Sequence, residues 1–167
     1  KDEFKLIYNY DLIDHIDTRI KEPKSIVKKM EKKKYDKTYL NLIEKINDIA
    51  GIRIVCTLKD DIFFIRDLVK QMPDIHVLKE KDYVTNPKES GYSSYHMIVE
   101  VPVKLTQKTI YVKCEIQIRT LAMDFWASFE HKVKYKTKND VNPKMSKELV
   151  SCAKMINKFD TKMINYK

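Results

Sequence analysis

The sequence is poor in glycine, cysteine and tryptophan. Its 167 residues include two glycines, three cysteines and one tryptophan. The phosphate-binding patterns GxxxxGK[ST] and GxGxxG need several clustered glycines, whereas Gly51 and Gly91 stand alone, so both patterns are absent. If a chain of this composition binds nucleotides, lysine and arginine side chains must therefore hold most of the phosphate charge.

The cysteines and the hydropathy indicate the compartment. The three cysteines are odd in number, widely separated and without a CxxC pair, so they indicate neither a disulfide framework nor a zinc site. They fit a reducing compartment, and Cys56 and Cys114, which lie in apolar runs, are expected to be small core residues. No apolar run approaches the about 18 residues of a membrane-spanning helix. We therefore expect a cytoplasmic protein without a membrane span.

Length and charge bound the domain organisation and the partners. The chain is long enough for one domain with its own core, and no repeat or linker is evident, so residues 1–167 are expected to form a single domain. Because the sequence begins with Lys1 rather than Met, it leaves open whether native terminal segments are missing. The net charge of +9 favours an anionic partner, although lysine runs such as residues 32–34 are also typical of a solvated surface.

Apolar periodicity predicts an α/β (α+β) domain, with a mixed β-sheet of four to five strands flanked by helices. The expected strands cover residues 52–58, 75–79, 96–103 and 110–119. The expected helices cover residues 4–16, a segment opened by Pro23 with Ser25 as its cap, and residues 39–47, 60–71, 121–134 and 144–165. Leu121, Phe125 and Phe129 are expected to pack the fifth helix together with Trp126.

The strand expected at residues 110–119 has one polar face. Side chains alternate along a strand, so every second residue from position 113 shares that face. These residues are Lys113, Glu115, Gln117 and Arg119. An antiparallel strand with one solvated face would show the same pattern, so the row is a candidate site rather than proof of one.

Two carboxylates and a set of cations are candidates for phosphate chemistry. Asp48 precedes the strand 52–58, and together with Glu115 it gives two carboxylates at strand positions, a common way to hold Mg²⁺ beside substrate phosphates. Tyr92, next to Gly91, offers a ring for stacking a base, or else covers the edge of the core. The candidate phosphate-binding cations are Arg19, Lys21, Lys28, Lys29, Arg53, Lys88 and Arg119.

Five stretches, in this order, resemble the synthetase domain of the RelA/SpoT family, most of all its small stand-alone alarmone synthetases. The stretches are Arg19-Ile-Lys21 with Ser25 and Lys29, Asp48-Ile-Ala-Gly-Ile-Arg53, Tyr83 to His96, Glu115-Ile-Gln117-Ile-Arg119-Thr, and Met123-Asp124-Phe-Trp126 to Lys136. The resemblance thus covers a motif core of residues 19–136. It implies a nucleotidyltransferase-like synthetase fold, with residues 144–165 as a C-terminal helix.

The resemblance also implies an activity and assigns roles. Members of this family transfer the β,γ-pyrophosphate of ATP to the 3′-OH of GDP or GTP, giving (p)ppGpp and AMP; GMP is a further candidate acceptor. Asp48 and Glu115 would bind Mg²⁺, and Glu115 would take the proton of the 3′-OH. On the ATP side, Arg19 and Arg53 would enclose the adenine, and Lys21, Ser25 and Lys29 would hold the phosphates. On the acceptor side, Tyr92 would stack on guanine, Lys88 and His96 would contact phosphates, Gln117 would support the acceptor, and Asp124 would face the guanine edge.

Alternatives remain open at this point. Asp124 stands where many small synthetases have Asn, and its carboxylate could accept from both N1–H and the 2-amino group of guanine. A toxic relative that pyrophosphorylates adenine nucleotides or the 3′ end of tRNA is the first alternative, and a non-catalytic RNA-binding module is the second. Tyr92 and Asp124 favour a guanine acceptor, and the carboxylates Asp48 and Glu115 disfavour a pure RNA binder; RNA binding is therefore not predicted.

The resemblance carries two further expectations. Small synthetases are often homotetramers, so a homo-oligomer is expected here, with a tetramer as the first candidate. The hydrolase motif of the long relatives is not matched, since the segment His15-Ile-Asp17 differs from it, and we expect synthesis without hydrolysis. The preference among GMP, GDP and GTP and any allosteric control by alarmone or RNA cannot be read from the sequence.

Overall fold

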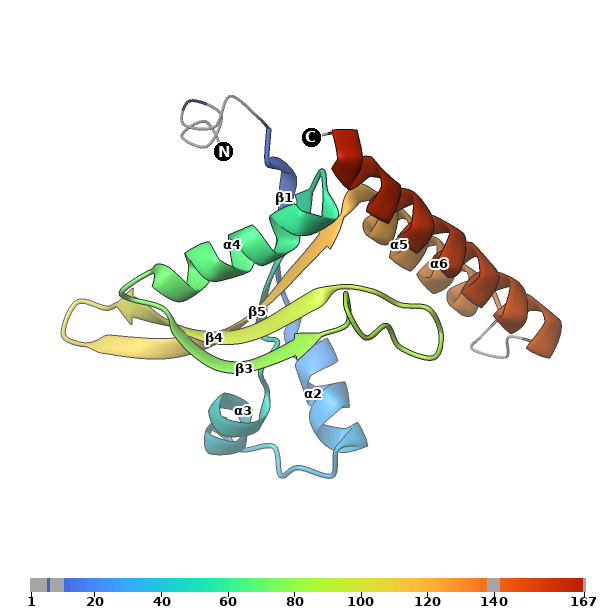
Figure 1. Ribbon diagram of the computed structural model, residues 1–167. Coiled ribbons are helices and arrows are strands. Elements are labelled where there is room, and N and C mark those ends of the chain that lie inside the picture. The colour runs from blue at the N-terminus through green and yellow to red at the C-terminus, as the bar shows by residue number, and fades with distance from the viewer. Residues whose placement is uncertain (1–5, 7–10, 138–141, 167) are drawn as a thin grey trace.

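The computed structural model describes Leu6 and residues 11–137 and 142–166. These residues form a sheet with helices on both faces and a helical pair at one end (Figure 1). The strands are β1 (Ile13–Ile20), β2 (Ala50–Cys56), β3 (His76–Asp82), β4 (Tyr95–Lys104) and β5 (Thr109–Thr120). The helices are α2 (Pro23–Lys32), α3 (Tyr39–Lys45), α4 (Lys59–Gln71), α5 (Leu121–Lys136) and α6 (Pro143–Met163), and the 3₁₀ helix η1 (Ile164–Tyr166) follows α6.

The sheet has five strands in the order β1-β2-β5-β4-β3. The β2–β5 pair is parallel, and the other three pairs are antiparallel. Parallel neighbours need a crossover connection, and here α4, β3 and β4 lie between β2 and β5 in the chain. The mixed sheet flanked by helices is therefore confirmed, and the strand expected to be central, β2, is an interior strand.

The main core lies between α4 and one face of the sheet. Ile62 and Ile65 of α4 belong to the same buried cluster as Ile54 of β2, Met97 of β4 and Ile118 of β5. Full burial of such a side chain contributes about 1.5–3 kcal/mol. In Figure 1, α4 covers this face, while α2 and α3 lie on the opposite side of the sheet. The polar row of β5 belongs to that opposite face.

A second, smaller core joins α5 to α6. Trp126 of α5 packs with Leu149 and Ala153 of α6, and its indole N–H donates to the main-chain oxygen of Leu149 at 3.1 Å. At the start of α5, the Thr120 hydroxyl donates to Asp160 of α6 at 2.6 Å. The two helices therefore act as one unit at the end of β5. None of the described helices is both long and apolar enough to cross a bilayer.

The expected helix at residues 4–16 is wrong at its C-terminal end. Residues 13–16 belong to strand β1, while residues 4–5 and 7–10 lie outside the described part. A bulge between Ile13 and His15 interrupts the alternation of β1, so the apolar spacing of Ile13 and Ile16 imitates a helix. The pairing with β2, which supplies the hydrogen bonds of β1, is not visible in local periodicity.

Two details of helix packing and capping also differ from expectation. Helix α2 starts at Pro23 with Glu22 in the cap position, and no side chain caps it, so Ser25 lies inside the first turn. On α5, the buried side chains are Met123, Trp126 and Glu130, whereas the stripe expected in the core is exposed. The exposed fractions of that stripe are 45% for Leu121, 69% for Phe125 and 50% for Phe129.

Candidate active site

Three polar side chains of β5 form a row on the face opposite α4. Glu115, Gln117 and Arg119 occupy alternate positions of β5, between β2 and β4. The alternation of side chains along a strand brings them onto one face, as predicted. Lys113 lies apart from this group, because its Nζ donates to the main-chain oxygen of Glu44 at 2.7 Å.

Asp48, just before β2, is held by two lysines. Its Oδ2 lies 2.6 Å from Nζ of Lys21, and its Oδ1 lies 2.7 Å from Nζ of Lys29 on α2. Burial alone would raise the pKa of Asp48, but the hydrogen bonds from Lys21 and Lys29 outweigh burial and leave the pKa below its usual range. Asp48 is therefore ionised at neutral pH, and its single charge is shared by two lysines, which leaves a net positive charge for another anion.

Arg19 and Arg53 lie beside Gly51, where β1 pairs with β2. Arg19 is directly opposite Gly51, and a Cβ on this glycine would lie 3.5 Å from Cγ and Nε of Arg19, an ordinary contact distance. Together with Glu115, the two arginines line a cavity of about 120 Å³. Arg53 also faces Asp124, whose Oδ1 lies 3.5 Å from its Nη1. The structure thus brings together the two arginines predicted for the adenine.

Ser25 is a predicted ATP-binding residue that the structure does not bring into contact with this group. It is exposed in the first turn of α2, where its amide donates to the main-chain oxygen of Glu22 at 2.9 Å. It does not line the pocket that contains Asp48. Its only link to the site is its spacing, because residues four apart on a helix share a face, and Lys29 is four residues further on.

The loop between β3 and β4 carries Lys88 and Tyr92. The amide of Gly91 donates to the oxygen of Lys88 at 2.8 Å, and the amide of Lys88 donates to the oxygen of Tyr92 at 3.0 Å, which closes a tight turn. Nζ of Lys88 lies 4.7 Å from the ring centroids of both Tyr83 and Tyr92. The hydroxyl of Tyr92 reaches β4, 2.9 Å from Nε2 of His96. The predicted acceptor residues of this loop and of β4 are therefore neighbours.

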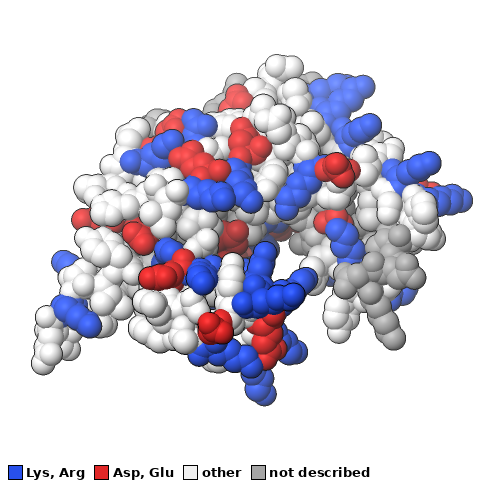
Figure 2. Space-filling model, turned by 90° about the horizontal axis from the view of Figure 1, so that it is seen from below, with Lys and Arg blue, Asp and Glu red and all other residues white. Residues whose placement is uncertain are grey.

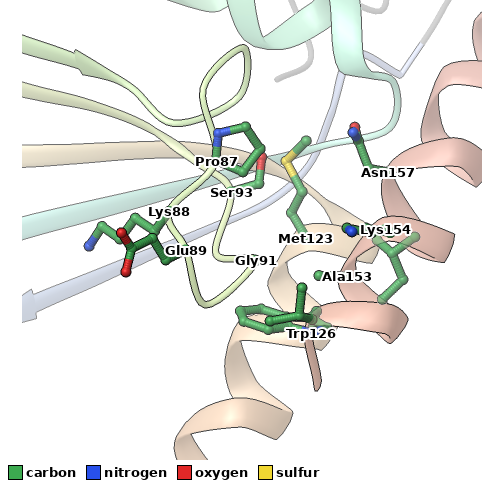
Figure 3. Close-up of a pocket in the computed structure, with 12 residues that line it drawn as sticks. Pro87, Lys88, Glu89, Gly91, Ser93, Met123, Trp126, Ala153, Lys154 and Asn157 are labelled. Atoms are coloured by element: carbon green, nitrogen blue, oxygen red, sulfur yellow. The ribbon is translucent and has the colours of Figure 1, made fainter. Parts of the chain in front are cut away.

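Gly91 lets this loop rest on α6. Its φ of 90° lies in the left-handed region, and a Cβ here would be 2.4 Å from Cβ of Ala153. Beside this contact, Met123 and Trp126 help to line a cavity of about 430 Å³ between the loop, α5 and α6 (Figure 3). In the same view the side chain of Lys88 extends away from α6. One side of the loop thus packs on the helices, and the other serves the site.

Glu115 faces a hydrogen-bonding nitrogen on each of its carboxylate oxygens. Nδ1 of His96 lies 3.3 Å from Oε1, and Nε2 of Gln117 donates to Oε2 at 3.1 Å. The hydrogen bond with His96 is the largest cause that lowers the pKa of Glu115; burial opposes it, and the bond from Gln117 adds to it. Glu115 is therefore a charged carboxylate at neutral pH, in the state in which it can accept a proton.

Arg119 has a place in the site that sequence reasoning missed. The sequence offers it as one of seven phosphate-binding candidates, but its side chain is only 4% exposed. Its Nη2 donates to the Tyr92 hydroxyl at 3.0 Å and to Oε1 of Gln117, and its Nη1 lies 3.4 Å from Oδ1 of Asp124. The signal that could have found it is its position at the buried end of the polar row, five residues before an acidic residue on the next helix.

A basic hollow of about 460 Å³ contains both carboxylates and His96. Figure 2 shows a hollowed surface on the side of α2 and α3, with Lys and Arg side chains gathered on it and acidic side chains between them. The lysines that line the hollow are Lys29, Lys33, Lys45, Lys79, Lys81 and Lys88. Sequence reasoning named only the first and the last, because the others come from separate elements that only the fold brings together.

Asp48 and Glu115 fit a magnesium ion that a nucleotide also holds. They line the same hollow, and Mg²⁺ is commonly bound by one or two carboxylates together with substrate phosphates. Within the described residues, no group of three or more acidic, histidine or cysteine side chains could hold a metal by itself. The pair of carboxylates therefore suits an ion shared with phosphate oxygens rather than a cage made only by the protein.

Comparison with known proteins gives the same pattern. The family model described as "Region found in RelA / SpoT proteins" matches residues 18–140. The GTP pyrophosphokinase YwaC of Bacillus subtilis is 45% identical over 165 residues, which cover 99% of this chain and 79% of YwaC. Every predicted site residue lies within the span that the family model matches.

Two solved structures of a second Bacillus subtilis protein, the small alarmone synthetase 1, are also similar. The structure bound to its product pppGpp has a TM-score of 0.89 and 33% sequence identity, and the match covers 99% of this chain and 84% of that one. The structure bound to AMPCPP has a TM-score of 0.78 and 32% identity over the same shares of the two chains. The similarity therefore extends from the motifs to the whole described fold.

Proposed function

Because this chain belongs to the RelA/SpoT family, we propose that its site binds ATP and a guanine nucleotide on two sides of Glu115. The activity is that of a GTP pyrophosphokinase, which transfers the β,γ-pyrophosphate of ATP to the 3′-OH of a guanine nucleotide and gives (p)ppGpp and AMP. The observation that carries the assignment of the site is the single hollow in which Asp48, His96 and Glu115 meet.

The donor half of the site consists of Arg19, Lys21, Lys29, Asp48 and Arg53. We assign the ATP phosphates to Lys21 and Lys29, whose ammonium groups now neutralise Asp48 and could turn to a more highly charged anion. Planar guanidinium groups stack on rings, so Arg19 and Arg53 suit the adenine. Ser25, one turn before Lys29 on α2, is a weaker candidate for the same phosphates.

The acceptor half consists of Lys88, Tyr92, His96, Gln117 and Asp124. We assign the guanine to the ring of Tyr92, since an aromatic face stacks on any base. Lys88 and His96 would contact the acceptor's phosphates, Gln117 would support the acceptor, and Asp124 would receive the guanine edge. Asp124 already faces two arginines, so a guanine that binds it would share this carboxylate with them.

The reaction is a displacement at phosphorus, and this chain supplies mainly positioning and charge. The 3′ oxygen of the acceptor attacks the β-phosphorus of ATP, the bond from that phosphorus to the oxygen of the α-phosphate breaks, and AMP leaves. Glu115 takes the proton of the 3′-OH, while Lys21 and Lys29 stabilise charge on the phosphate oxygens. Asp48 and Glu115 would hold the magnesium ion, which supplies further charge neutralisation at the phosphates.

Nucleotide chromatography tests this assignment. The protein would be incubated with ATP and Mg²⁺ and, in separate reactions, with GMP, GDP, GTP, ADP or tRNA. We expect AMP and a guanine nucleotide that carries two additional phosphates, and the relative rates would rank the three guanine acceptors. Turnover with ADP or tRNA but with no guanine nucleotide would contradict the proposal and assign the alternative acceptor instead.

The remaining expectations stay proposals. We propose one synthetase domain over residues 1–167 that assembles into a homo-oligomer, with a tetramer as the first candidate, and that acts in the cytoplasm without hydrolysing its product. Light scattering at several protein concentrations tests the assembly. Incubation of purified (p)ppGpp with the protein, with Mg²⁺ or Mn²⁺, tests for hydrolysis.

A further inference from the structure

Five side chains of the acceptor side form a closed ring of hydrogen bonds. One arm runs from Arg119 to the Tyr92 hydroxyl at 3.0 Å, from there to Nε2 of His96 at 2.9 Å, and from Nδ1 of His96 to Glu115 at 3.3 Å. The other arm runs from Arg119 to Oε1 of Gln117 and from Nε2 of Gln117 to Glu115 at 3.1 Å. Both arms start at the guanidinium and end at the carboxylate.

With a neutral His96, the two ends of the ring fix the direction of every bond in it. A guanidinium can only donate, and an ionised carboxylate can only accept. The Tyr92 oxygen therefore accepts from Arg119, its own proton goes to Nε2 of His96, and His96 presents Nδ1–H to Glu115. On the other arm, Gln117 must turn its oxygen to Arg119 and its amide nitrogen to Glu115. No member can rotate or change tautomer without leaving another member unpaired.

The burial of Arg119 agrees with a role in positioning rather than in contact with phosphate. Its side chain is 4% exposed, and its Nε is buried without a hydrogen-bond partner in the described structure. Its distance to Asp124, 3.4 Å, is longer than its bond to Tyr92, so an ion pair alone does not explain its orientation. Its guanidinium carbon lies 5.6 Å from the centroid of the Tyr92 ring, a cation–π distance.

We propose that Arg119 is a positioning residue for the acceptor. It fixes the direction of the hydrogen bonds in the ring of five side chains, and so it aligns the aromatic side chain of Tyr92 with Glu115. This inference rests on the proposed function, because it concerns how the acceptor half is held in place. The ring joins the group that would stack on the base to the group that would take the 3′-OH proton. A guanine nucleotide that stacks on Tyr92 would then meet Glu115 at a fixed separation. Lysine cannot replace Arg119, because it lacks the planar fork in which Nη1 faces Asp124 while Nη2 donates to Tyr92 and Gln117.

Steady-state kinetics with ATP and GDP varied separately test the proposal. Tyr92→Phe keeps the aromatic ring for stacking and removes the hydroxyl that joins Arg119 to His96, and Arg119→Lys keeps the charge and removes the fork. We expect each variant to lower kcat/KM for GDP about 10- to 100-fold, the range for losing a hydrogen bond to a charged group, while KM for ATP changes little. The double variant should lose little more than Arg119→Lys alone, because both substitutions break the same arm.

Arg66→Lys is the matched control. Arg66 also lies against a tyrosine ring, at 5.5 Å from the centroid of Tyr95, but it is on α4 and is paired with Asp67. We expect its kinetics to equal those of the wild type. If Arg119→Lys fails to fold, Tyr92→Phe decides alone, because it changes no buried charge.

Three outcomes are distinguishable. If the wild-type protein transfers pyrophosphate to no guanine nucleotide, the proposed function is wrong, and with it the role of Arg119. If the wild type is active and the Tyr92→Phe variant has the same kcat/KM for GDP, the proposed role of the hydrogen-bond ring is wrong. Losses that multiply in the double variant, or that fall equally on ATP and GDP, would also overturn it, because independent damage to the scaffold gives that pattern.

Discussion

Gly51 and Gly91 stand at the two halves of the site, and an added Cβ would meet different surroundings at the two positions. A Cβ on Gly51 would meet Arg19 at an ordinary 3.5 Å, whereas a Cβ on Gly91 would lie 2.4 Å from Ala153, at a φ of 90°. Space remains on the donor side, where the nearest neighbour is a flexible side chain. On the acceptor side, the backbone at Gly91 packs directly against Ala153 of α6.

The side chains of the two halves differ in the same way. In the donor half, partly exposed lysines neutralise Asp48, and a nucleotide must exchange these ion pairs for its own. In the acceptor half, Tyr92 is joined to His96, and His96 to Glu115, by hydrogen bonds within the protein. On the proposed assignment, the acceptor side chains are thus linked to one another, whereas the donor lysines must leave Asp48 to bind the phosphates. Preorganised groups lose less freedom when they bind.

Glu115→Gln should have the largest effect, because Glu115 is the residue at which the halves meet. The substitution removes the base that would take the 3′-OH proton and one carboxylate of the magnesium pair. Loss of a general base alone lowers kcat about 10²- to 10⁴-fold. The rate of AMP release measures it, and circular dichroism checks the fold. Near-normal turnover in a folded variant would remove Glu115 from the mechanism.

Tyr92→Ala should separate the two substrates. Loss of one base–aromatic stack costs about 1–3 kcal/mol, so we expect KM for the acceptor to rise about 5- to 150-fold, with a much smaller change for ATP. Initial rates with each nucleotide varied in turn provide the measurement. An equal rise for ATP and GDP would place Tyr92 in the common scaffold and erase the difference between the halves.

Asp124 offers a finer test, because it lies between an arginine of the donor half and Arg119. If it receives the guanine edge, Asp124→Ala leaves a donor of the base unpaired, which costs about 1–2 kcal/mol, or about 5- to 30-fold in acceptor affinity. Asp124→Asn keeps one acceptor atom and should be milder.

Comparison of GDP with IDP, which lacks only the 2-amino group, identifies the cause. If Asp124→Ala lowers the melting temperature but leaves the ratio of kcat/KM for GDP to kcat/KM for IDP unchanged, Asp124 stabilises the arginines and the N-terminus of α5 and does not bind guanine.

Features that depend on local sequence could be predicted. The polar row of β5 followed from strict alternation over residues 113–119. The magnesium role of Asp48 and Glu115 was predicted from their strand positions, and the role of Glu115 as a base from the resemblance; the fold then placed both carboxylates in one hollow. These roles stay predictions until transfer is measured.

Features that depend on long-range contact could not be predicted. Strand β1 is stabilised by its pairing with β2, which the local sequence does not show. Because a bulge interrupts its alternation of side chains, its apolar spacing resembled that of a helix. Arg119 looked like any other cation, because its hydrogen bond to Tyr92 joins β5 to the loop before β4, 27 residues away in the chain. Its second partner, Gln117, lies two residues away on the same strand face. The basic hollow likewise combines lysines of α2, α3 and β3, whose proximity only the folded chain creates.

The most direct test of the contrast between the halves is the pair Gly91→Ala and Gly51→Ala. The first forces an alanine into the left-handed region against Ala153, a strain of about 1–3 kcal/mol, whereas the second adds a methyl group at an ordinary distance from Arg19. Initial rates with ATP and GDP varied separately would be measured for both variants. We predict that Gly91→Ala raises KM for GDP with little change for ATP, and that Gly51→Ala changes KM for GDP far less. A rise in KM for GDP that is equal in both variants, or larger in Gly51→Ala, would contradict it.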